Sequence, residues 1–285
     1  MTKKTIVSII IATKNEERIL NKTLASIKKQ TYSSSLIEII VVDNNSRDKT
    51  KQIARKYTDK IYNKGPERGV QKNLGVKHSK GSILFFPDAD MIMSKNLVKE
   101  SVAILESKKD LVGLYVPLRW RGNNWLIKAK GFEREFYDAT CLDAARVVRK
   151  NIYQKIGGYD EKFFANDDWD LNRRISKHGP IGITSAKLYH YENENMTVAS
   201  YINKQKYYSP NVNQYIKKYG QSDPLIKKQL GIYYRFFKVF VEDGKWKKII
   251  SHPKLFLHCY FLKILNFHNF YTCIINKHPF LKLSL

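Results

Sequence analysis

The sequence predicts an α/β protein built around a doubly wound, mostly parallel sheet with helices on both faces. Two observations lead to this class. Short β-rich runs alternate with helical patterns along roughly the first ninety residues, and a polar, acidic segment follows each predicted strand. The chain has 285 residues, of which 43% are hydrophobic and 27% are charged, so it can bury a sizeable core.

The first predicted elements form a βαβ unit. A strand over Thr5–Ala12 precedes a helix over Glu17–Lys29, and a second strand covers Ile37–Val42. The helix is predicted from apolar residues at helical spacing, namely Ile19, Leu20, Leu24 and Ile27. Three further elements follow, a helix over 48–57, a helix over 70–78 and a strand over 82–86. Ligands of such sheets bind at the carboxyl ends of the strands, so the residues after each strand matter most.

The net charge of +25 favours phosphate-rich partners, which could be nucleic acid, anionic lipid or nucleotide substrates, and does not choose among them.

The three cysteines, Cys141, Cys259 and Cys273, form no CxxC pair, which argues against a disulfide framework or a zinc site and favours a reducing, cytosol-facing location. The apolar run near the N-terminus is short and lacks a small-residue cleavage site, so we expect a first strand and no signal peptide.

The acidic and aromatic residues are unevenly distributed. Residues 201–285 hold 15 Lys and Arg but only three acids, and they carry 18 of the 36 aromatic side chains. We therefore predict a catalytic or binding domain over residues 1–220, followed by a helical, basic and aromatic membrane-associating region over residues 221–285.

Three polar clusters follow the predicted strands, at Thr13–Glu16, Asp43–Asp48 and Pro87–Asp90. Neither a GxGxxG nor a Walker sequence is present, so another device must hold any diphosphate. In the Asp88-Ala89-Asp90 motif, one carboxylate can accept hydrogen bonds from a ribose while the other ligates a hard cation. The alternative is a helix cap or a solvated turn.

Five segments in order resemble the inverting glycosyltransferases of family 2, which share the GT-A fold. They are SIIIATKNEE, IEIIVVDNNSRDKT, GVQKNLG, ILFFPDAD and GGYDEKFFANDDWDLNRR, and the resemblance covers about residues 5–210. It implies a nucleotide-sugar donor and a role for each strand-end cluster. The resemblance would place Thr13, Asn15 and Glu16 in the nucleoside pocket, Asp43 on the base, Asp88 on the ribose or base edge, and Asp90 on Mg²⁺ or Mn²⁺ bound to the diphosphate, with Asp88 as a second candidate metal ligand.

Three further residues carry weaker implications of the resemblance. Lys72 stands where the family often has Arg, which keeps the charge but loses bidentate phosphate geometry; a solvated helix face is the alternative. Arg146 matches an Arg of a membrane-associated branch that would contact a diphosphate or an acceptor phosphate, unless it is an ordinary surface residue. His190 corresponds to a late His near the metal, although a lone His is more often structural.

The catalytic base implied by the resemblance is Asp168, with Asp167 as a possible substitute. The pair is expected to open a helix, whose N-terminus favours ionised carboxylates. An ionised Asp168 could take the proton of an acceptor hydroxyl and so support displacement with inversion. The alternative is a run of capping acids with an Asp170–Arg173 pair.

The function expected from these residues is metal-dependent transfer of a sugar from a UDP- or GDP-sugar to a hydroxyl or phosphate, on a polyprenyl-linked acceptor or another cell-envelope glycan or lipid. A basic nucleic-acid-binding protein is one alternative, but clustered acids would repel a phosphate backbone, so no nucleic acid is expected. An inactive scaffold of the same fold is the other.

The C-terminal region is expected to bind an anionic membrane surface peripherally, on the cytoplasmic face of the cell membrane. The segment Leu255–Ile275 has about the length of a membrane span, but polar residues interrupt it. At helical spacing His258, Asn266, Asn269 and Thr272 are predicted on one side and apolar residues on the other, as in a helix lying in the membrane interface. A helix packed on the catalytic domain is the alternative.

Overall fold

The computed structural model describes residues 4–164, 166–208 and 212–267. The chain divides into two compact units. Unit 1 comprises Met1–Leu118 and Ala144–Tyr191, and unit 2 comprises Arg119–Asp143 and Glu192–Leu285. The residues after 220 are thus one part of a larger unit that also takes in an earlier segment of the chain. The predicted functional division at residue 220 remains a prediction.

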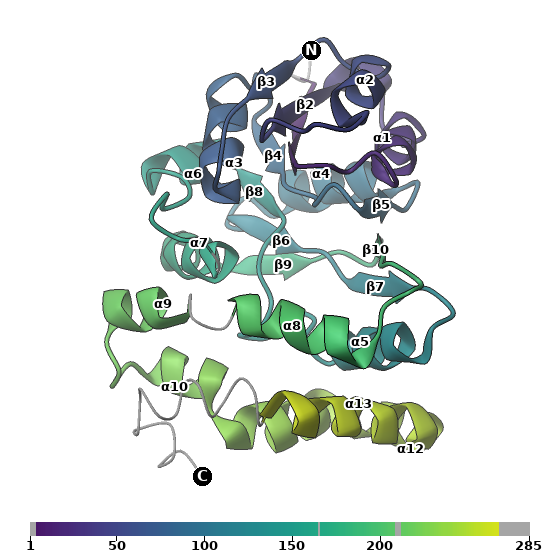
Figure 1. Ribbon diagram of the computed structural model, residues 1–285. Helices are drawn as coiled ribbons and strands as arrows, with labels where there is room; N and C mark the ends of the chain where they lie inside the picture. The colour runs from purple at the N-terminus through teal and green to yellow at the C-terminus, as the bar shows by residue number, and fades with distance from the viewer. Residues whose placement is uncertain (1–3, 165, 209–211, 268–285) are drawn as a thin grey trace. The chain divides into compact units, whose positions relative to one another are not determined.

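Unit 1 is built on a seven-stranded sheet in the order β3-β2-β1-β4-β8-β6-β9 (Figure 1). Strands β1 to β4 run parallel, β8 is antiparallel to both of its neighbours, and β6 and β9 are again parallel. The predicted mostly parallel α/β sheet is confirmed. The strands are β1 (Val7–Thr13), β2 (Ile37–Asp43), β3 (Ile61–Asn63), β4 (Ile83–Phe85), β6 (Gly113–Tyr115), β8 (Val147–Arg149) and β9 (Ile181–Ile183).

A short second sheet in unit 1 contains β5 (Met91–Met93) and β10 (Leu188–Tyr191), which pair antiparallel. In this register His190 lies opposite Met91, next to Asp90. Strand β5 directly follows the Asp88-Ala89-Asp90 motif. The pairing therefore brings this motif next to β10, which lies about one hundred residues later in the sequence.

The helices of unit 1 follow the predicted alternation. They are α1 (Leu20–Lys28), α2 (Thr50–Arg55), α3 (Arg68–Lys77), α4 (Leu97–Ser107), α6 (Lys150–Lys155) and α7 (Asp167–Ile175), with short 3₁₀ turns η1 (Ser34–Leu36) and η2 (Ser176–His178). One apolar cluster joins inward side chains of β1, β2, β4 and β8 to α3, α6 and α7, which cover one face of the sheet. Helix α3 packs so closely that a Cβ on Gly75 would lie 2.4 Å from Ile10.

Helix α1 begins three residues later than predicted, at Leu20, and Ile19 occupies its N-cap position. The amides of Glu16 and Glu17 donate instead to Thr50 Oγ1 and Asp48 Oδ2 in the loop after β2. The Glu16 carbonyl accepts from the Leu20 amide (2.9 Å), so a single turn precedes the helix.

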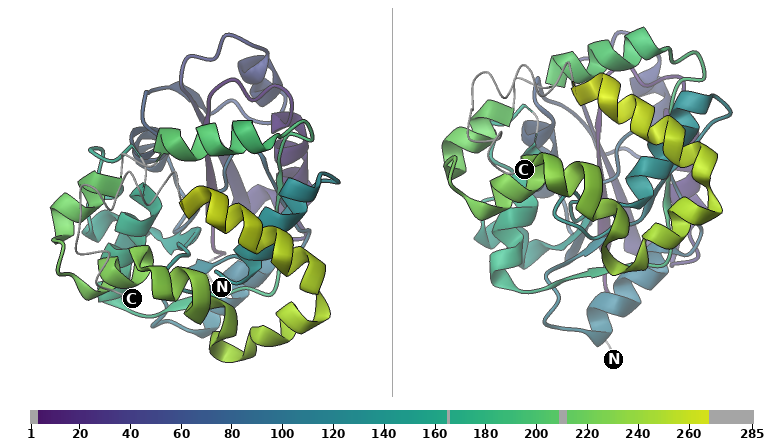
Figure 2. Two further views of the ribbon diagram at one scale, coloured as in Figure 1. Left: turned by 60° about the horizontal axis from the view of Figure 1, so that its bottom comes forward. Right: turned by 90° about the horizontal axis from the view of Figure 1, so that it is seen from below.

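Unit 2 is mainly helical (Figures 1 and 2). Strand β7 (Leu118–Arg121) lies at its boundary and leads to α5 (Trp125–Glu135). The later helices are α8 (Val198–Tyr208), α9 (Val212–Tyr219), α10 (Pro224–Leu230), a π-helical turn (Tyr234–Lys238), α11 (Val239–Val241), η5 (Glu242–Gly244), α12 (Trp246–Ser251) and α13 (Pro253–Asn266). Helix α13 packs along α5, with Leu262 in an apolar cluster that includes Leu126, Ile127 and Tyr201.

In the part of the chain that the structure describes, no helix has the length and apolar character needed to cross a bilayer. Helix α13 covers the first part of the predicted segment Leu255–Ile275, and Asn269 and Thr272 lie outside the described residues. The predicted division of sides is wrong for Asn266, which is half-buried and donates a hydrogen bond to Tyr201. The side of α13 that faces the rest of unit 2 therefore contains polar groups.

Candidate active site

The loops that follow β1 and β2 are tied together by a buried carboxylate. Asp43, at the end of β2, is fully buried, and its carboxylate accepts hydrogen bonds from Thr13 Oγ1 (3.0 Å) and from the Ser46 amide (2.7 Å). The Ser46 hydroxyl donates to the same group and in turn accepts from the Asn15 amide. Asp43 and Thr13 thus shape the strand-end loops, and the predicted contacts of Thr13 and Asp43 with a nucleoside remain predictions.

Asn15 and Glu16 line the loop after β1. Asn15 adopts a left-handed backbone conformation (φ 55°), and its Oδ1 accepts from the Arg47 amide (3.0 Å). Burial and the neighbouring Asp90 raise the pKa of Glu16 to about 7. An acid with such a pKa marks a place where negative charge accumulates and where a cation would be favoured.

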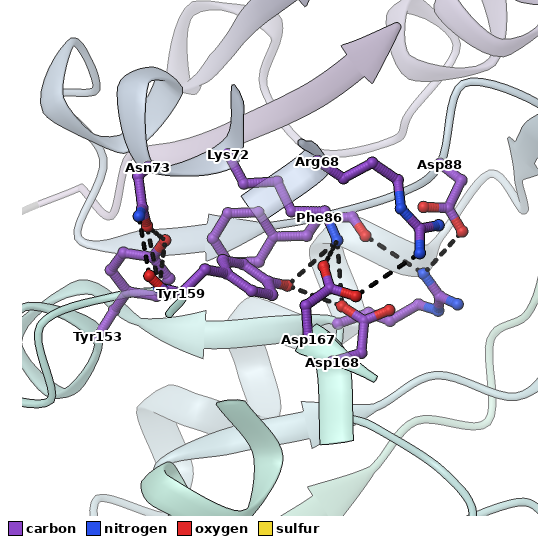
Figure 3. A network of polar contacts seen from close by, with 10 residues as sticks. Arg68, Lys72, Asn73, Phe86, Asp88, Tyr153, Tyr159, Asp167 and Asp168 are labelled. Atoms are coloured by element: carbon purple, nitrogen blue, oxygen red, sulfur yellow. Dashed lines mark hydrogen bonds and ion pairs between the residues drawn. The ribbon is translucent and has the colours of Figure 1, made fainter. Parts of the chain in front are cut away.

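The centre of the site is a cluster of charges between α3 and α7 (Figure 3). Lys72 has only 1% of its side chain exposed, and its Nζ lies 3.1 Å from Asp168 Oδ1 and 3.9 Å from Asp167 Oδ2. One turn earlier on α3, Arg68 Nη2 lies 3.6 Å from Asp167 Oδ1. The alternative of a solvated helix face for Lys72 is therefore wrong. Its charge is buried against the two predicted catalytic acids.

The two acids differ in their electrostatic surroundings. Burial alone would raise the pKa of Asp168, but Lys72, Arg146 and Arg68 outweigh it and hold that pKa well below its usual range. Asp167 is 2% exposed, and its burial together with the charge of Asp168 raises its pKa. Asp168 keeps 29% of its side chain exposed. Asp168 is thus the ionised and accessible member of the pair, as expected of the base.

The hydroxyl of Tyr159 fixes the orientation of the Asp168 side chain. Its hydroxyl donates to Asp168 Oδ1 (3.0 Å) and lies 3.3 Å from Lys72 Nζ, and its ring stacks under the Lys72 ammonium. The same oxygen of Asp168 therefore receives both Lys72 and Tyr159, which leaves Oδ2 as the oxygen available to a substrate proton.

A tight turn over Gly157–Gly158 places Tyr159. Both glycines have left-handed backbones, and a Cβ on Gly158 would lie 2.6 Å from Asn73 Oδ1. That Asn73 oxygen accepts from the Tyr159 amide (2.9 Å) and from the Tyr153 hydroxyl (2.6 Å). Asp170, fully buried on α7, binds Arg174, whose Nη1 donates to the carbonyls of this turn.

Arg146 and Asp88 meet at the neighbouring strand end. Arg146 directly precedes β8, and its Nη1 lies 3.3 Å from Asp88 Oδ2 and 3.4 Å from the Phe86 carbonyl. The positive charges of Arg146, Lys72 and Arg68 outweigh the effect of burial and lower the pKa of Asp88. Arg146 is thus a member of the charged site and not an isolated surface residue.

The predicted metal ligands Asp90 and His190 are also brought together. His190 Nδ1 lies 3.3 Å from Asp90 Oδ1, across the β5–β10 pair. A carboxylate is a suitable ligand for Mg²⁺ or Mn²⁺, and an imidazole suits Mn²⁺ better than Mg²⁺. The described residues contain no cluster of three or more His, Cys, Asp or Glu that could hold a metal alone. Metal binding by Asp90 and His190 remains a prediction.

Two members of the site, Arg68 and Tyr159, were not predicted from the sequence. Arg68 stands four residues before Lys72, so the helical period placed both on one face of α3. Tyr159 was contained in the Gly-Gly-Tyr-Asp segment without a role, because only the folded turn shows that its hydroxyl reaches Asp168.

Comparison with known proteins decides the family. The family described as Glycosyl transferase family 2 matches residues 8–164, more than half of the chain. The chain belongs to glycosyltransferase family 2. The match ends before Asp167, so the assignment of the base in this family 2 glycosyltransferase rests on the geometry above and on the resemblance of the α7 segment.

Relatives of this family 2 glycosyltransferase occur in bacteria and archaea. Glycosyltransferase AglE of Haloferax volcanii is 35% identical over 195 residues, covering 61% of this chain and 62% of that protein. Probable glycosyltransferase YdaM of Bacillus subtilis is 27% identical over 61% of this chain and 47% of its own length. The poly(ribitol-phosphate) β-N-acetylglucosaminyltransferase TarS of Staphylococcus aureus is 25% identical over 70% and 38%, respectively. The match to the last two spans less than half of their lengths.

Solved structures show the same GT-A fold at low sequence identity. The mannosyltransferase PcManGT from Pyrobaculum calidifontis, in complex with GDP-Man and Mn²⁺, superimposes with a TM-score of 0.59 at 16% identity, covering 99% of this chain and 86% of that one. S. aureus TarS 1–349 in complex with UDP-GlcNAc gives 0.54 at 18% identity, covering 89% and 79%. The predicted GT-A fold is confirmed.

Proposed function

We propose that this glycosyltransferase transfers a sugar, with inversion, from a UDP- or GDP-sugar to an acceptor hydroxyl. The observation that carries the proposal is the arrangement of Asp168. Lys72 and Tyr159 hold its Oδ1 at 3.1 and 3.0 Å, the carboxylate is ionised, and 29% of the side chain stays exposed. This is the arrangement needed for a fixed general base at the end of a sheet.

In the proposed reaction Asp168 accepts the proton of the acceptor hydroxyl, whose oxygen forms a bond to the anomeric carbon. The bond from that carbon to the diphosphate breaks on the opposite face, and the nucleoside diphosphate leaves with the electron pair. Arg68, Lys72 and Arg146 supply positive charge for the diphosphate. Because they also lower the pKa of Asp168, a bound diphosphate that draws on their charge would raise that pKa and strengthen the base.

We further propose that Mg²⁺ or Mn²⁺ is bound with the donor by Asp90 and His190. The cation supplies Lewis-acid stabilisation of the leaving diphosphate. Asp90 and His190 lie 3.3 Å apart, and Asp90 and Asp88 contribute to the raised pKa of Glu16, so this part of the site favours a cation. The mannosyltransferase that superimposes on this chain was solved with Mn²⁺. Asp88, which binds Arg146, is better suited to contact the nucleoside.

The acceptor we propose is a polyprenyl-linked or other cell-envelope glycan or lipid, with a hydroxyl at the attachment point. A membrane-borne acceptor suits the excess of 51 basic over 26 acidic residues and the many aromatic side chains after residue 200. We accordingly propose that the protein works peripherally on an anionic membrane surface, on the cytoplasmic face of the cell membrane.

The first test is donor turnover by an Asp168→Asn variant. Hydrolysis of a panel of UDP- and GDP-sugars in the presence of Mn²⁺ should identify the donor, and the variant should bind that donor normally in calorimetry while its turnover falls by about two to four decades. The matched control is Asp59→Asn, an exposed acid before β3, which should change neither quantity. Near-normal turnover by the Asp168 variant would transfer the role of base to Asp167 or another residue.

The metal is tested separately by binding. Donor affinity measured with Mn²⁺ and after chelation should differ by at least about tenfold in the native protein, and the difference should shrink in an Asp90→Asn variant. Equally tight binding with and without the cation would reject the proposed metal site.

A further inference from the structure

The large apolar side chains that the described residues leave exposed are concentrated in unit 2. All of them except Ile183 belong to this unit, and eight lie between residues 233 and 264. Isolated exposed apolar residues are ordinary on a protein surface, but a concentration in one region indicates a contact surface.

Helix α13 exposes several large apolar side chains, while it buries a lysine beside Cys259 and Leu262. Lys263 is 5% exposed, because its Nζ lies 2.7 Å from Glu133 on α5, inside unit 2. Leu257, Phe261 and Ile264 instead point outward, with 67%, 50% and 60% of each residue exposed. A helix bathed in water on its outer side would place leucine, phenylalanine and isoleucine inward and lysine outward. The outer side of α13 is therefore suited to an apolar medium.

These outward side chains form one continuous surface, which we call the α13 face and define as Trp125, Leu257, Phe261 and Ile264. Leu257, Phe261 and Ile264 follow the helical spacing of four and three residues. Trp125, at the start of α5, lies 6.4 Å from Phe261 between ring centroids and is 40% exposed. Figure 2 shows α13 running on from α12, where Trp246 and Ile250 add further exposed apolar area.

Most charged side chains around the α13 face are basic, and one acid, the exposed Glu194, accepts hydrogen bonds from the amides of Asn123 and Asn124 just before Trp125. The side chains of Lys128, Lys247 and Lys254, on or next to α5, α12 and α13, are exposed. No Asp or Glu follows Asp243 in the whole sequence. Apolar and tryptophan side chains bordered by lysines match the layered chemistry of a bilayer surface, in which acyl chains lie beneath anionic headgroups. This charge distribution favours lipid over a second copy of the chain, whose own face would bring lysines against lysines.

We propose that the α13 face inserts into the headgroup boundary of an anionic bilayer, with the bordering lysines on the lipid phosphates. The inference rests on the membrane location proposed above and names the surface that makes the contact. It needs no catalytic residue, so vesicle binding and donor turnover report on separate proposals.

The experiment is flotation of the full-length chain with vesicles of phosphatidylglycerol and phosphatidylcholine. The native protein should float with them at low salt and float poorly with pure phosphatidylcholine. A Leu257→Gln/Phe261→Gln/Ile264→Gln variant should lose at least about tenfold in vesicle affinity, and a Lys247→Gln/Lys254→Gln variant should lose less affinity and should show a weaker salt dependence. The matched control is Ile183→Gln on β9 of unit 1, which is 45% exposed and should float as the native protein does.

A second measurement uses the native protein, in which no side chain of the α13 face is replaced. Lipids brominated on the acyl chain should quench the tryptophan fluorescence of the native protein, and Trp125→Phe should remove a large part of that quenching. Unaltered flotation of the triple variant, or the absence of quenching, would overturn the inference. A native dimer that the triple variant converts to a monomer would equally overturn it, because the face would then bind a second copy. Loss of flotation with unchanged donor hydrolysis would support it, and lack of donor hydrolysis by the native protein would overturn the proposed function alone.

Discussion

Lys72 carries its charge in a place where water cannot solvate it. Its side chain is 1% exposed, and its ammonium group lies within 3.9 Å of both Asp167 and Asp168. A buried charge of this kind is tolerated only with close partners, and removal of one partner is costly. The three residues are therefore expected to respond together to any change that affects one of them.

The hydroxyl of Tyr159 gives a prediction at this scale. Tyr159→Phe keeps the ring under Lys72 but removes the hydrogen bond to Asp168, which is worth about 1.5–3 kcal/mol for a charged acceptor. Donor turnover should fall about tenfold or more with little change in donor affinity, and the acid limb of the pH profile should move to higher pH because the ionised form of Asp168 loses a donor.

The matched control is Tyr153→Phe. It removes a hydroxyl from the same layer, which donates to Asn73 Oδ1 and accepts from the Tyr159 amide but makes no hydrogen bond to Asp168. We expect this change to lower thermal stability without moving the pH profile. An equal shift of the profile in both variants would show that Tyr159 acts only through packing.

Glu16 gives a prediction for stability against pH. Its pKa in the folded protein is about 7, above the ordinary 4.5, so the folded state holds more protons than the unfolded state between these values and loses stability as the pH rises through them. Glu16→Gln should therefore melt like the native protein at pH 5 and about 2–4 °C higher at pH 8. This corresponds to about 1 kcal/mol after allowance for solvent screening. Equal melting temperatures at pH 8 would contradict the raised pKa.

At the scale of elements, the turn before α7 delivers Tyr159 to Asp168. The two glycines of that turn share a left-handed backbone but differ in the space around them. A Cβ on Gly158 would meet Asn73 and Tyr153 within about 3 Å, and a Cβ on Gly157 would meet nothing within 4 Å. Substitution of the two by alanine therefore separates backbone strain from steric conflict.

Gly157→Ala should cost only the left-handed backbone term, about 1–2 kcal/mol. Gly158→Ala should cost more and should also reduce donor turnover, because the displaced Asn73 positions the Tyr159 amide. Denaturant unfolding and donor hydrolysis of both variants measure the two effects. A Gly158 variant that is as stable and as active as the Gly157 variant would show that the turn is not coupled to the site.

The sequence was sufficient to predict the βαβ elements, because apolar periodicity is local, and the strand-end positions of Asp43, Asp88 and Asp90 followed from them. The start of α1 was missed, since Thr50 and Asp48 bind the amides before it from another loop. The burial of Lys72 was also beyond the sequence, because its partner Asp168 lies 96 residues away along the chain. Local patterns do not record such long-range contacts.

At the scale of the whole molecule, the packing of α13 on α5 predicts the behaviour of a shortened chain. A protein ending at Gly220 would lose Leu262 from the cluster with Leu126 and Ile127 and would leave Glu133 without Lys263. We expect it to aggregate and to bind a hydrophobic dye, which size-exclusion chromatography and dye fluorescence would measure. A monodisperse product with a cooperative melting transition would show that α5 is stable without its cover.

The assembly of unit 2 from two separate stretches of chain has a consequence for synthesis. Helix α5 is synthesised about 120 residues before α13. At about 5–20 residues per second, synthesis of the intervening chain takes roughly 6–24 s. Throughout that interval Leu126, Ile127 and Phe132 lack the cover that the finished unit gives them. The nascent chain thus passes through a period in which chaperone capture and misassociation compete with completion of the fold.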